Sequence, residues 1–183
     1  MQLKSSAERY GAIAQLFHWT TLVLIVTQFI LAYQAEHTES LLQKAKTLTT
    51  HKSVGMTVFM LVILRLLWRM TNPAPTPLVT EQPWQRRLAD CMHWALYSLI
   101  LLTPVVGLLM SSAKNYPVSW FGLFTWPNFV QPNEPLFDFL KAAHGILATT
   151  IFCLAVLHII AALKHHFYDK DNVLRRMLPL KLR

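Results

Sequence analysis

Charged residues are scarce in this sequence of 183 residues, and cysteine is scarcer still. Only 14% of the residues are charged, whereas 54% are hydrophobic. A soluble domain of this length does not need so little charge, so the composition excludes that class and predicts a protein with several membrane spans. The two cysteines do not form a CxxCH motif, which excludes a covalently attached c-type haem on the usual signature.

Four long apolar stretches are present, at residues 13–33, 51–68, 92–110 and 142–163. Each is close to the ~20 residues that a helix needs to cross the hydrocarbon core of a bilayer. We therefore predict an all-α integral membrane protein, with residues 1–183 forming a single domain built as a four-helix transmembrane bundle. No small-residue cleavage site follows the first stretch, so we interpret it as a retained span rather than a signal peptide.

Lysine and arginine are unevenly distributed between the connecting segments. Of the 17 basic residues, twelve lie on the side that carries both termini and five lie on the other side. The positive-inside rule then predicts that the N- and C-termini are cytoplasmic. The net charge of +8 mostly reflects this asymmetry and contact with anionic lipid, so it does not call for a nucleic-acid partner. The five outer lysines are Lys44, Lys46, Lys52, Lys114 and Lys141.

The longest loop, at residues 111–140, lies on the outer side and is rich in aromatic residues and proline. This composition predicts an interfacial cap with Trp120 and Trp126 at headgroup depth, and such a cap would cover an outer cofactor. In the preceding span, Pro104 and Gly107 predict a kink.

Four histidines lie inside the apolar stretches. His144 and His158 are fourteen residues apart, which leaves them about 40° apart around one helix and ~21 Å apart along it. With the N-terminus inside, His51 and His144 fall near the outer surface, because each begins an even-numbered span. His18, early in the first span, and His158, late in the fourth, fall toward the cytoplasm. The histidines therefore form two pairs, one in each leaflet.

Two neutral imidazoles fill both axial positions of a haem iron, an arrangement that favours electron transfer over oxygen binding. Zinc and copper also accept imidazole, but neither level contains the cysteines or carboxylates that commonly accompany those ions. We predict that the iron of two haems is held by His18, His51, His144 and His158. His93 is a fifth histidine at the inner level, either a competing ligand or a partner of a haem propionate.

Glycines and arginines accompany the histidines. Gly55 shares a helix face with His51 and Gly145 adjoins His144, so both either admit a flat macrocycle or serve helix packing. Arg65 and Arg69 lie one turn apart at the inner end of the second span. We predict that they contact haem propionates, with snorkelling to the interface as the alternative.

His165 follows the fourth span at the cytoplasmic interface, seven residues beyond His158 and near the same helix face. A histidine there can hydrogen-bond a quinone carbonyl and exchange protons near neutral pH. We predict a quinone site at His165, with an ordinary interfacial histidine as the alternative.

Five short motifs extend over nearly the whole chain. They are HW at residues 18–19, HKSVG at 51–55, RLLWR at 65–69, the pair His144 and His158, and the ending KHHFYDKDN at 164–172. Together they resemble the bacterial cytochrome b561 family. The resemblance implies a bacterial inner-membrane cytochrome with two non-covalent b haems, one on His18 and His158 and the other on His51 and His144.

The family includes a superoxide oxidase, which takes an electron from periplasmic superoxide and reduces ubiquinone, and His165 matches a position associated with its quinone site. By this resemblance we expect an oxidoreductase that passes electrons from superoxide, through the outer and inner haems, to ubiquinone. Attraction of superoxide would require positive charge near the outer haem.

Two other functions remain open from the sequence. Related cytochrome b subunits pass electrons between a partner dehydrogenase and the quinone pool, and no cysteine-rich or glycine-rich domain here would replace such a partner. A non-redox metal-binding or transport protein is disfavoured, because carboxylates are scarce in the spans.

Overall fold

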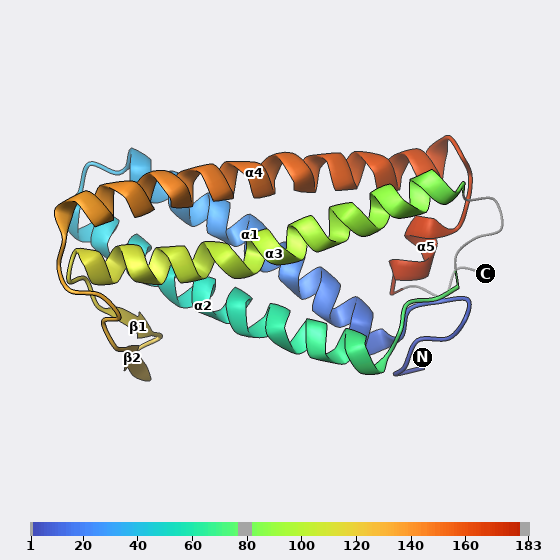
Figure 1. Cartoon of the computed structure of the whole chain (residues 1–183), viewed down its shortest axis with the longest axis horizontal. Coiled ribbons are helices and arrows are strands. Elements are labelled where there is room, and N and C mark those ends of the chain that lie inside the picture. The colour runs from blue at the N-terminus through green and yellow to red at the C-terminus, as the bar shows by residue number, and fades with distance from the viewer. Residues whose placement is uncertain (1, 77–81, 180–183) are drawn as a thin grey trace.

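The computed structural model describes residues 2–76 and 82–179. Its four long helices run lengthwise beside one another (Figure 1), and each is long and apolar enough to cross a membrane. The predicted four-helix architecture is therefore confirmed. The helices are α1 (Ala12–His37), α2 (Leu41–Thr71), α3 (Pro83–Ala113) and α4 (Glu134–Phe167).

The helices extend beyond the apolar stretches that predict them. Helix α2 begins at Leu41, where the side chain of Ser40 accepts a hydrogen bond from the backbone N–H of Gln43. Helix α4 begins at Glu134, after an equivalent cap by Asn133. A polar N-cap sets where a helix begins, whereas the apolar run marks only the part of the helix that would lie inside the bilayer. His51 consequently lies nearly three turns inside α2 rather than at its start.

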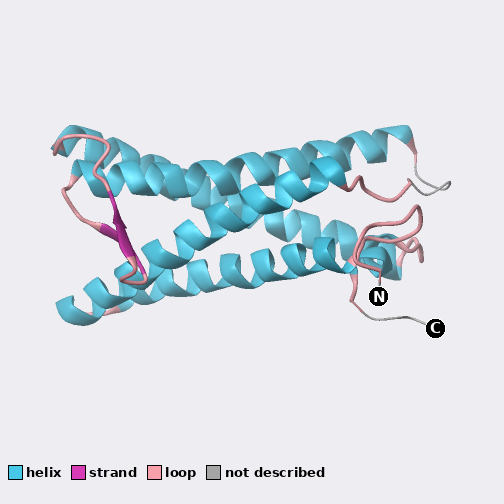
Figure 2. Cartoon of the chain, turned by 90° about the horizontal axis from the view of Figure 1, so that it is seen from below, coloured by secondary structure: helices cyan, strands magenta, loops and turns pink. Residues whose placement is uncertain are grey.

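Packing is uneven around the bundle. Helix α1 packs on α2, α2 on α3, and α3 on α4. A small core of Val58, Val62 and Tyr97 joins α2 to α3. Helix α4 is different, because Leu140 and Ile151 are its only buried residues in the described chain. The view in Figure 2 shows the four helices with the connecting segments gathered at the two ends.

The predicted cap at one end contains a β-hairpin of strands β1 (Val118–Trp120) and β2 (Phe124–Trp126). Its turn places Phe121 and Gly122 at φ of 50° and 75°. The loop is shorter than predicted, since α3 continues to Ala113 and α4 begins twenty-one residues later. We call this end of the bundle the hairpin end.

The hairpin is attached to α2 just beyond His51. The hydroxyl of Ser53, which is 1% exposed, donates to the carbonyl of Ser119 at 2.8 Å and accepts from the N–H of Phe121 at 3.1 Å. The indole N–H of Trp120 donates to Thr57 Oγ1 at 3.1 Å. These bonds hold the cap against the turn of α2 that carries His51.

The opposite end, here called the tail end, brings together the N-terminal segment and the short helix α5 (Val173–Met177) (Figure 1). Trp19 Nε1 donates to the carbonyl of Met177 at 2.9 Å, and Gln15 Nε2 donates to the carbonyl of Arg176 at 3.3 Å. The side chain of Arg176 also donates to the carbonyl of Thr76 at 2.6 Å. The tail is thereby fastened to α1 and to the connector after α2.

Candidate functional site

Two pairs of histidine rings face each other, one toward each end of the bundle. His51 on α2 and His144 on α4 form the hairpin-end pair, with ring centres 6.3 Å apart. His18 on α1 and His158 on α4 form the tail-end pair, also with ring centres 6.3 Å apart. The structure places together the partners that depth in the membrane predicts, while their role as ligands stays a prediction.

The ring separation is suited to a metal between the imidazoles. Two bonds from a metal to imidazole nitrogens take up about 4 Å, and the remainder corresponds to the half-widths of two rings. In both pairs one ring comes from α4, which packs mainly on α3 among the long helices, while its partner ring comes from α1 or α2. The imidazoles thus extend across the more open side of the bundle.

His144 is oriented by α3. Its Nδ1–H donates to the carbonyl of Thr103 at 3.2 Å, which leaves Nε2 as the nitrogen with a free lone pair. A Cβ atom at residue 107 would lie 3.1 Å from Cε1 of this ring, so the absence of a side chain at Gly107 makes space for the ring. From the sequence Gly107 indicated only a kink, and neither contact of His144 had been predicted.

His51 is buried beside a polar residue of α1. Its Nδ1 has no hydrogen-bond partner in the described structure, while its backbone carbonyl accepts from Gln28 Nε2 at 3.0 Å. A Cβ at Gly55 would lie 2.8 Å from that same Gln28 nitrogen, so Gly55 accommodates Gln28 and serves helix packing. At Gly145, by contrast, an added Cβ would meet nothing within 4 Å.

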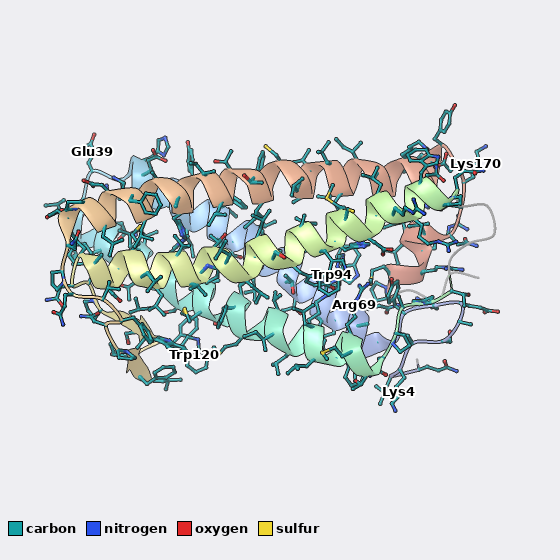
Figure 3. The ribbon with its side chains drawn as sticks, viewed as in Figure 1. Lys4, Glu39, Arg69, Trp94, Trp120 and Lys170 are labelled. Carbon is teal, nitrogen blue, oxygen red and sulfur yellow. The ribbon has the colours of Figure 1, made fainter. Side chains whose placement is uncertain are left out.

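The tail-end pair lies among cations. Arg65 Nη2 donates to His18 Nδ1 at 3.0 Å, and its guanidinium lies 5.2 Å from the centre of the Tyr97 ring. Arg69, labelled in Figure 3, lies 5.9 Å from the same ring. Neither arginine forms an ion pair with a carboxylate in the described part of the chain. Both are partly buried, so the position favours an anionic partner.

His93 on α3 is a third imidazole at the tail end, with its ring centre 5.4 Å from that of His158. His165, the predicted quinone residue, lies farther along α4, where its Nδ1 is 2.6 Å from Asp171 Oδ2.

The outer lysines differ in their partners. Lys114 is paired with Glu134, and this hydrogen bond raises the pKa of the Lys114 ammonium. Lys52 follows His51 directly, is partly buried, and forms no ion pair in the described residues. Its ammonium lies 3.4 Å from the carbonyl of Pro117 and 5.5 Å from the centre of the Tyr116 ring. Lys52 therefore carries the uncompensated positive charge nearest in sequence to the hairpin-end pair.

Known proteins resemble the chain over nearly its whole length. The profile of the family described as prokaryotic cytochrome b561 matches residues 9–180. Cytochrome b561 homolog 2 of Escherichia coli (strain K12) is 37% identical over 181 residues, covering 97% of this chain and 95% of that protein. The probable superoxide oxidase CybB of Yersinia pestis is 30% identical over 177 residues, covering 95% of this chain and 98% of that protein.

A further relative, cytochrome b561 homolog 1 of Escherichia coli (strain K12), is 29% identical over 167 residues, covering 88% of this chain and 92% of that protein. The paired imidazoles, the four apolar helices and these matches agree with one another. The chain belongs to the prokaryotic cytochrome b561 family, and is accordingly a multi-pass electron-transfer protein of the bacterial inner membrane that binds haem b.

Proposed function

We propose that this protein holds two b haems, one in each histidine pair, and conducts electrons from the hairpin end to a quinone at the tail end. The proposal rests mainly on the repetition of one donor set: two imidazole pairs with the same 6.3 Å separation toward opposite ends of the bundle. Nitrogen ligands without thiolates or carboxylates suit a haem. The basic residues gathered at the tail end support a cytoplasmic tail end and a periplasmic hairpin end.

The residues around the pairs fit such a cofactor. His144 presents a free Nε2 because the Thr103 carbonyl accepts a hydrogen bond from its Nδ1–H. Such a bond is the usual way in which a protein fixes the tautomer of a metal-binding histidine. Arg65 and Arg69 have no carboxylate partner in the described chain, so they suit the two propionates of a haem. A b haem held by two imidazoles would supply one-electron transfer.

We propose superoxide as the electron donor and ubiquinone as the acceptor. Two superoxide anions each lose one electron and become oxygen, and one quinone takes up two electrons and two protons. Lys52 supports this donor, since an unpaired cation beside His51 attracts a small anion. The name of the Yersinia relative, a probable superoxide oxidase, supports it as well. His165 at the tail end supplies a hydrogen-bonding and proton-exchanging group for the quinone.

A pyridine haemochrome count on the purified protein tests the cofactor content, with two b haems per chain as the expected result. A pulse of superoxide should then reduce the haems much faster than superoxide dismutates, and added ubiquinone should reoxidise them. One haem per chain would contradict the pairing, and haem spectra unchanged by the pulse would contradict the donor.

A separate periplasmic redox enzyme is the alternative donor. The hairpin favours this possibility, because Phe121 and Leu123 are 56% and 74% exposed at the end where a donor would dock. Purification under mild conditions distinguishes the two donors: a partner enzyme would copurify, and the isolated chain would then show little reaction with superoxide.

A further inference from the structure

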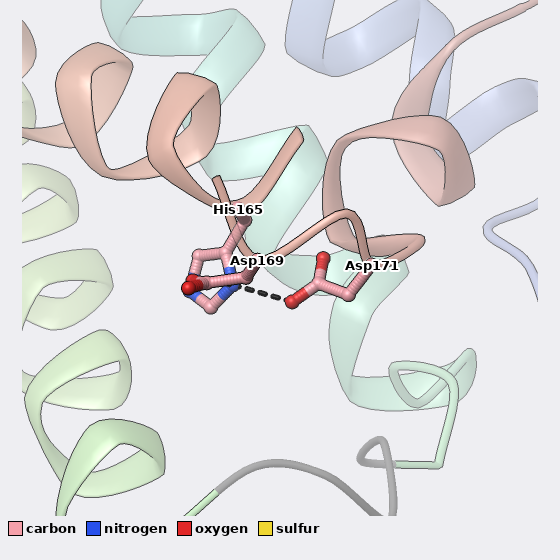
Figure 4. A group of neighbouring side chains, drawn as sticks. All are labelled: His165, Asp169 and Asp171. Carbon is pink, nitrogen blue, oxygen red and sulfur yellow. Dashed lines mark hydrogen bonds and ion pairs between the residues drawn. The ribbon is translucent and has the colours of Figure 1, made fainter. Parts of the chain in front are cut away.

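His165 lies in an ordered acidic setting at the end of α4. Its Nδ1 is 2.6 Å from Asp171 Oδ2 and 3.3 Å from Asp169 Oδ2 (Figure 4). The side chains of His165 and Asp171 are 22% and 14% exposed, so the shorter contact is largely shielded from water. Because a carboxylate only accepts, the ring nitrogen that faces Asp171 carries a proton.

Asp171 is held in place by the backbone around it. Its Oδ1 accepts from the N–H of Val173 at 2.9 Å, and its own N–H donates to the carbonyl of His165 at 3.1 Å. The intervening turn places Lys170 at a φ of 54°. Both carboxylate oxygens therefore have fixed partners, which distinguishes Asp171 from a mobile surface acid.

Asp169 has a different partner. Lys164 Nζ lies 2.8 and 2.6 Å from its two oxygens, so its charge is already balanced by an ammonium. The same lysine argues against a metal ion among His165, Asp169 and Asp171, since a cation there would compete with it. The geometry thus separates one acid that serves His165 from one that serves Lys164.

We propose that Asp171 is a positioning residue for quinone reduction, an inference that rests on the proposed function. By accepting the Nδ1–H of His165, Asp171 fixes the ring and leaves Nε2 as the nitrogen that exchanges a proton with a quinone carbonyl. With its Nδ1–H held on Asp171, the ring donates from Nε2 in its doubly protonated form.

Reduction of the quinone consumes two electrons and two protons. In the proposed function, two electrons from the donor reach the quinone through the haems, and two protons come from cytoplasmic water. His165 transfers the first proton from Nε2 to a carbonyl oxygen as the new O–H bond forms, and keeps its Nδ1–H on Asp171. The ring then takes a proton back from water, and the second carbonyl oxygen receives its proton from water.

The test uses purified full-length holoprotein, reduced with dithionite without oxygen and mixed with a short-chain ubiquinone in a stopped-flow spectrometer. Relative to wild type, D171N should lower the haem oxidation rate at saturating quinone by about 10²-fold, the usual contribution of a positioned acid. The quinone concentration giving half the maximal rate should change less than about threefold, because Asp171 acts through His165 and would not itself contact the quinone. The ratio of the haem oxidation rates in H2O and D2O should be larger for D171N than for wild type. D171E should recover part of the rate lost in D171N.

Two variants control for structure. D169N changes the same residue type beside the same ring and should alter the rate less than about threefold. R176Q loosens the attachment of α5 to Thr76 without touching His165, and should also leave the rate nearly unchanged. If D171N loses haem or fails to fold, D171E replaces it, because it keeps the charge but displaces the carboxylate from Nδ1, and its rate should lie between those of wild type and H165N. H165N should show the same 10²-fold loss.

The possible outcomes distinguish the proposed function from the role of Asp171. A wild-type protein that quinone does not oxidise would overturn the proposed function and this inference with it. A wild-type protein that reacts while D171N keeps its rate would overturn only the role of Asp171. Equal losses in D171N and R176Q would also overturn that role, because they would trace the effect to docking of the tail.

Discussion

The two histidine pairs have the same ring separation but opposite surroundings. At the hairpin end, the Thr103 carbonyl accepts the Nδ1–H of His144 and leaves Nε2 free to bind a metal. At the tail end, His18 Nδ1 receives a hydrogen bond from Arg65, which can only donate. While that contact lasts, a neutral His18 ring carries its proton on Nε2, so neither nitrogen has a free lone pair.

The difference shows that equal spacing does not mean equal readiness for a cofactor. At the hairpin end His144 already presents a free ring nitrogen, whereas at the tail end Arg65 would have to leave His18 before that ring could bind a metal. The unpaired charge of Arg65 gives it a destination, because a propionate offers the carboxylate that the described protein does not. We therefore expect haem added to haem-free protein to occupy the hairpin-end pair first.

Replacing one histidine pair should have the largest effect, because it removes both proposed ligands of one haem. H51A with H144A should remove the hairpin-end haem and leave one haem per chain, and H18A with H158A should remove the other haem. At the hairpin end, no third imidazole of the described residues is in ring contact with His51 or His144, whereas at the tail end His93 lies beside His158. Haem counts and low-temperature absorption spectra measure the result, and H37A serves as a control because His37 stacks on Tyr33 outside both pairs. H93A should keep both haems; loss of one would identify His93 as a ligand.

Gly107 and Gly145 provide a matched test of the hairpin end. G107A places a methyl group 3.1 Å from Cε1 of His144, whereas G145A meets nothing within 4 Å. We expect G107A to weaken haem binding at the hairpin end about tenfold, as displacing a ligand's support commonly does. Haem titration of the haem-free protein measures the affinity. An unchanged affinity in G107A, or an equal loss in G145A, would mean that His144 does not depend on this contact.

The pairing of the histidines was predictable, whereas their surroundings were not. The rise of about 1.5 Å per residue separates His144 from His158 along α4, so counting residues is enough to assign them to opposite ends of the bundle. The contacts of His18 with Arg65 and of His144 with Thr103 depend on helix rotation and spacing, which an apolar run does not specify. The hairpin was missed because its strands have three residues each and its turn includes Phe121 at positive φ.

Arg65 offers a test of the tail end alone. R65M removes a positive charge beside His18, which destabilises the more negative reduced haem. A charge interaction of about 1–2 kcal/mol corresponds to about 40–90 mV for one electron, so the tail-end midpoint potential should fall by that amount. R65K keeps the charge and should shift the potential less. Redox titration followed by haem absorption resolves the two haems, and a matching fall at the hairpin end would contradict this local assignment.

Lys52 gives the smallest expected effect and tests the positive charge at the hairpin end. Lys52 directly follows His51 in the sequence, and its ammonium has no carboxylate partner in the described residues, whereas Glu134 already balances Lys114. K52Q should lower the second-order rate of haem reduction by superoxide about threefold at low salt, because a nearby cation raises the local concentration of an anion. The loss should shrink as added salt screens the charge.

K44Q is the control for Lys52, since it makes the same charge change at an exposed position in the first turn of α2. Pulse radiolysis with absorption detection measures the rates of both variants. Equal losses in K52Q and K44Q would mean that overall charge attracts superoxide and that Lys52 has no special position. A loss in K52Q that persists at high salt would point instead to its contacts with Pro117 and Tyr116, which hold the loop before β1. Only a salt-dependent loss specific to Lys52 would place the entry of the anion beside His51.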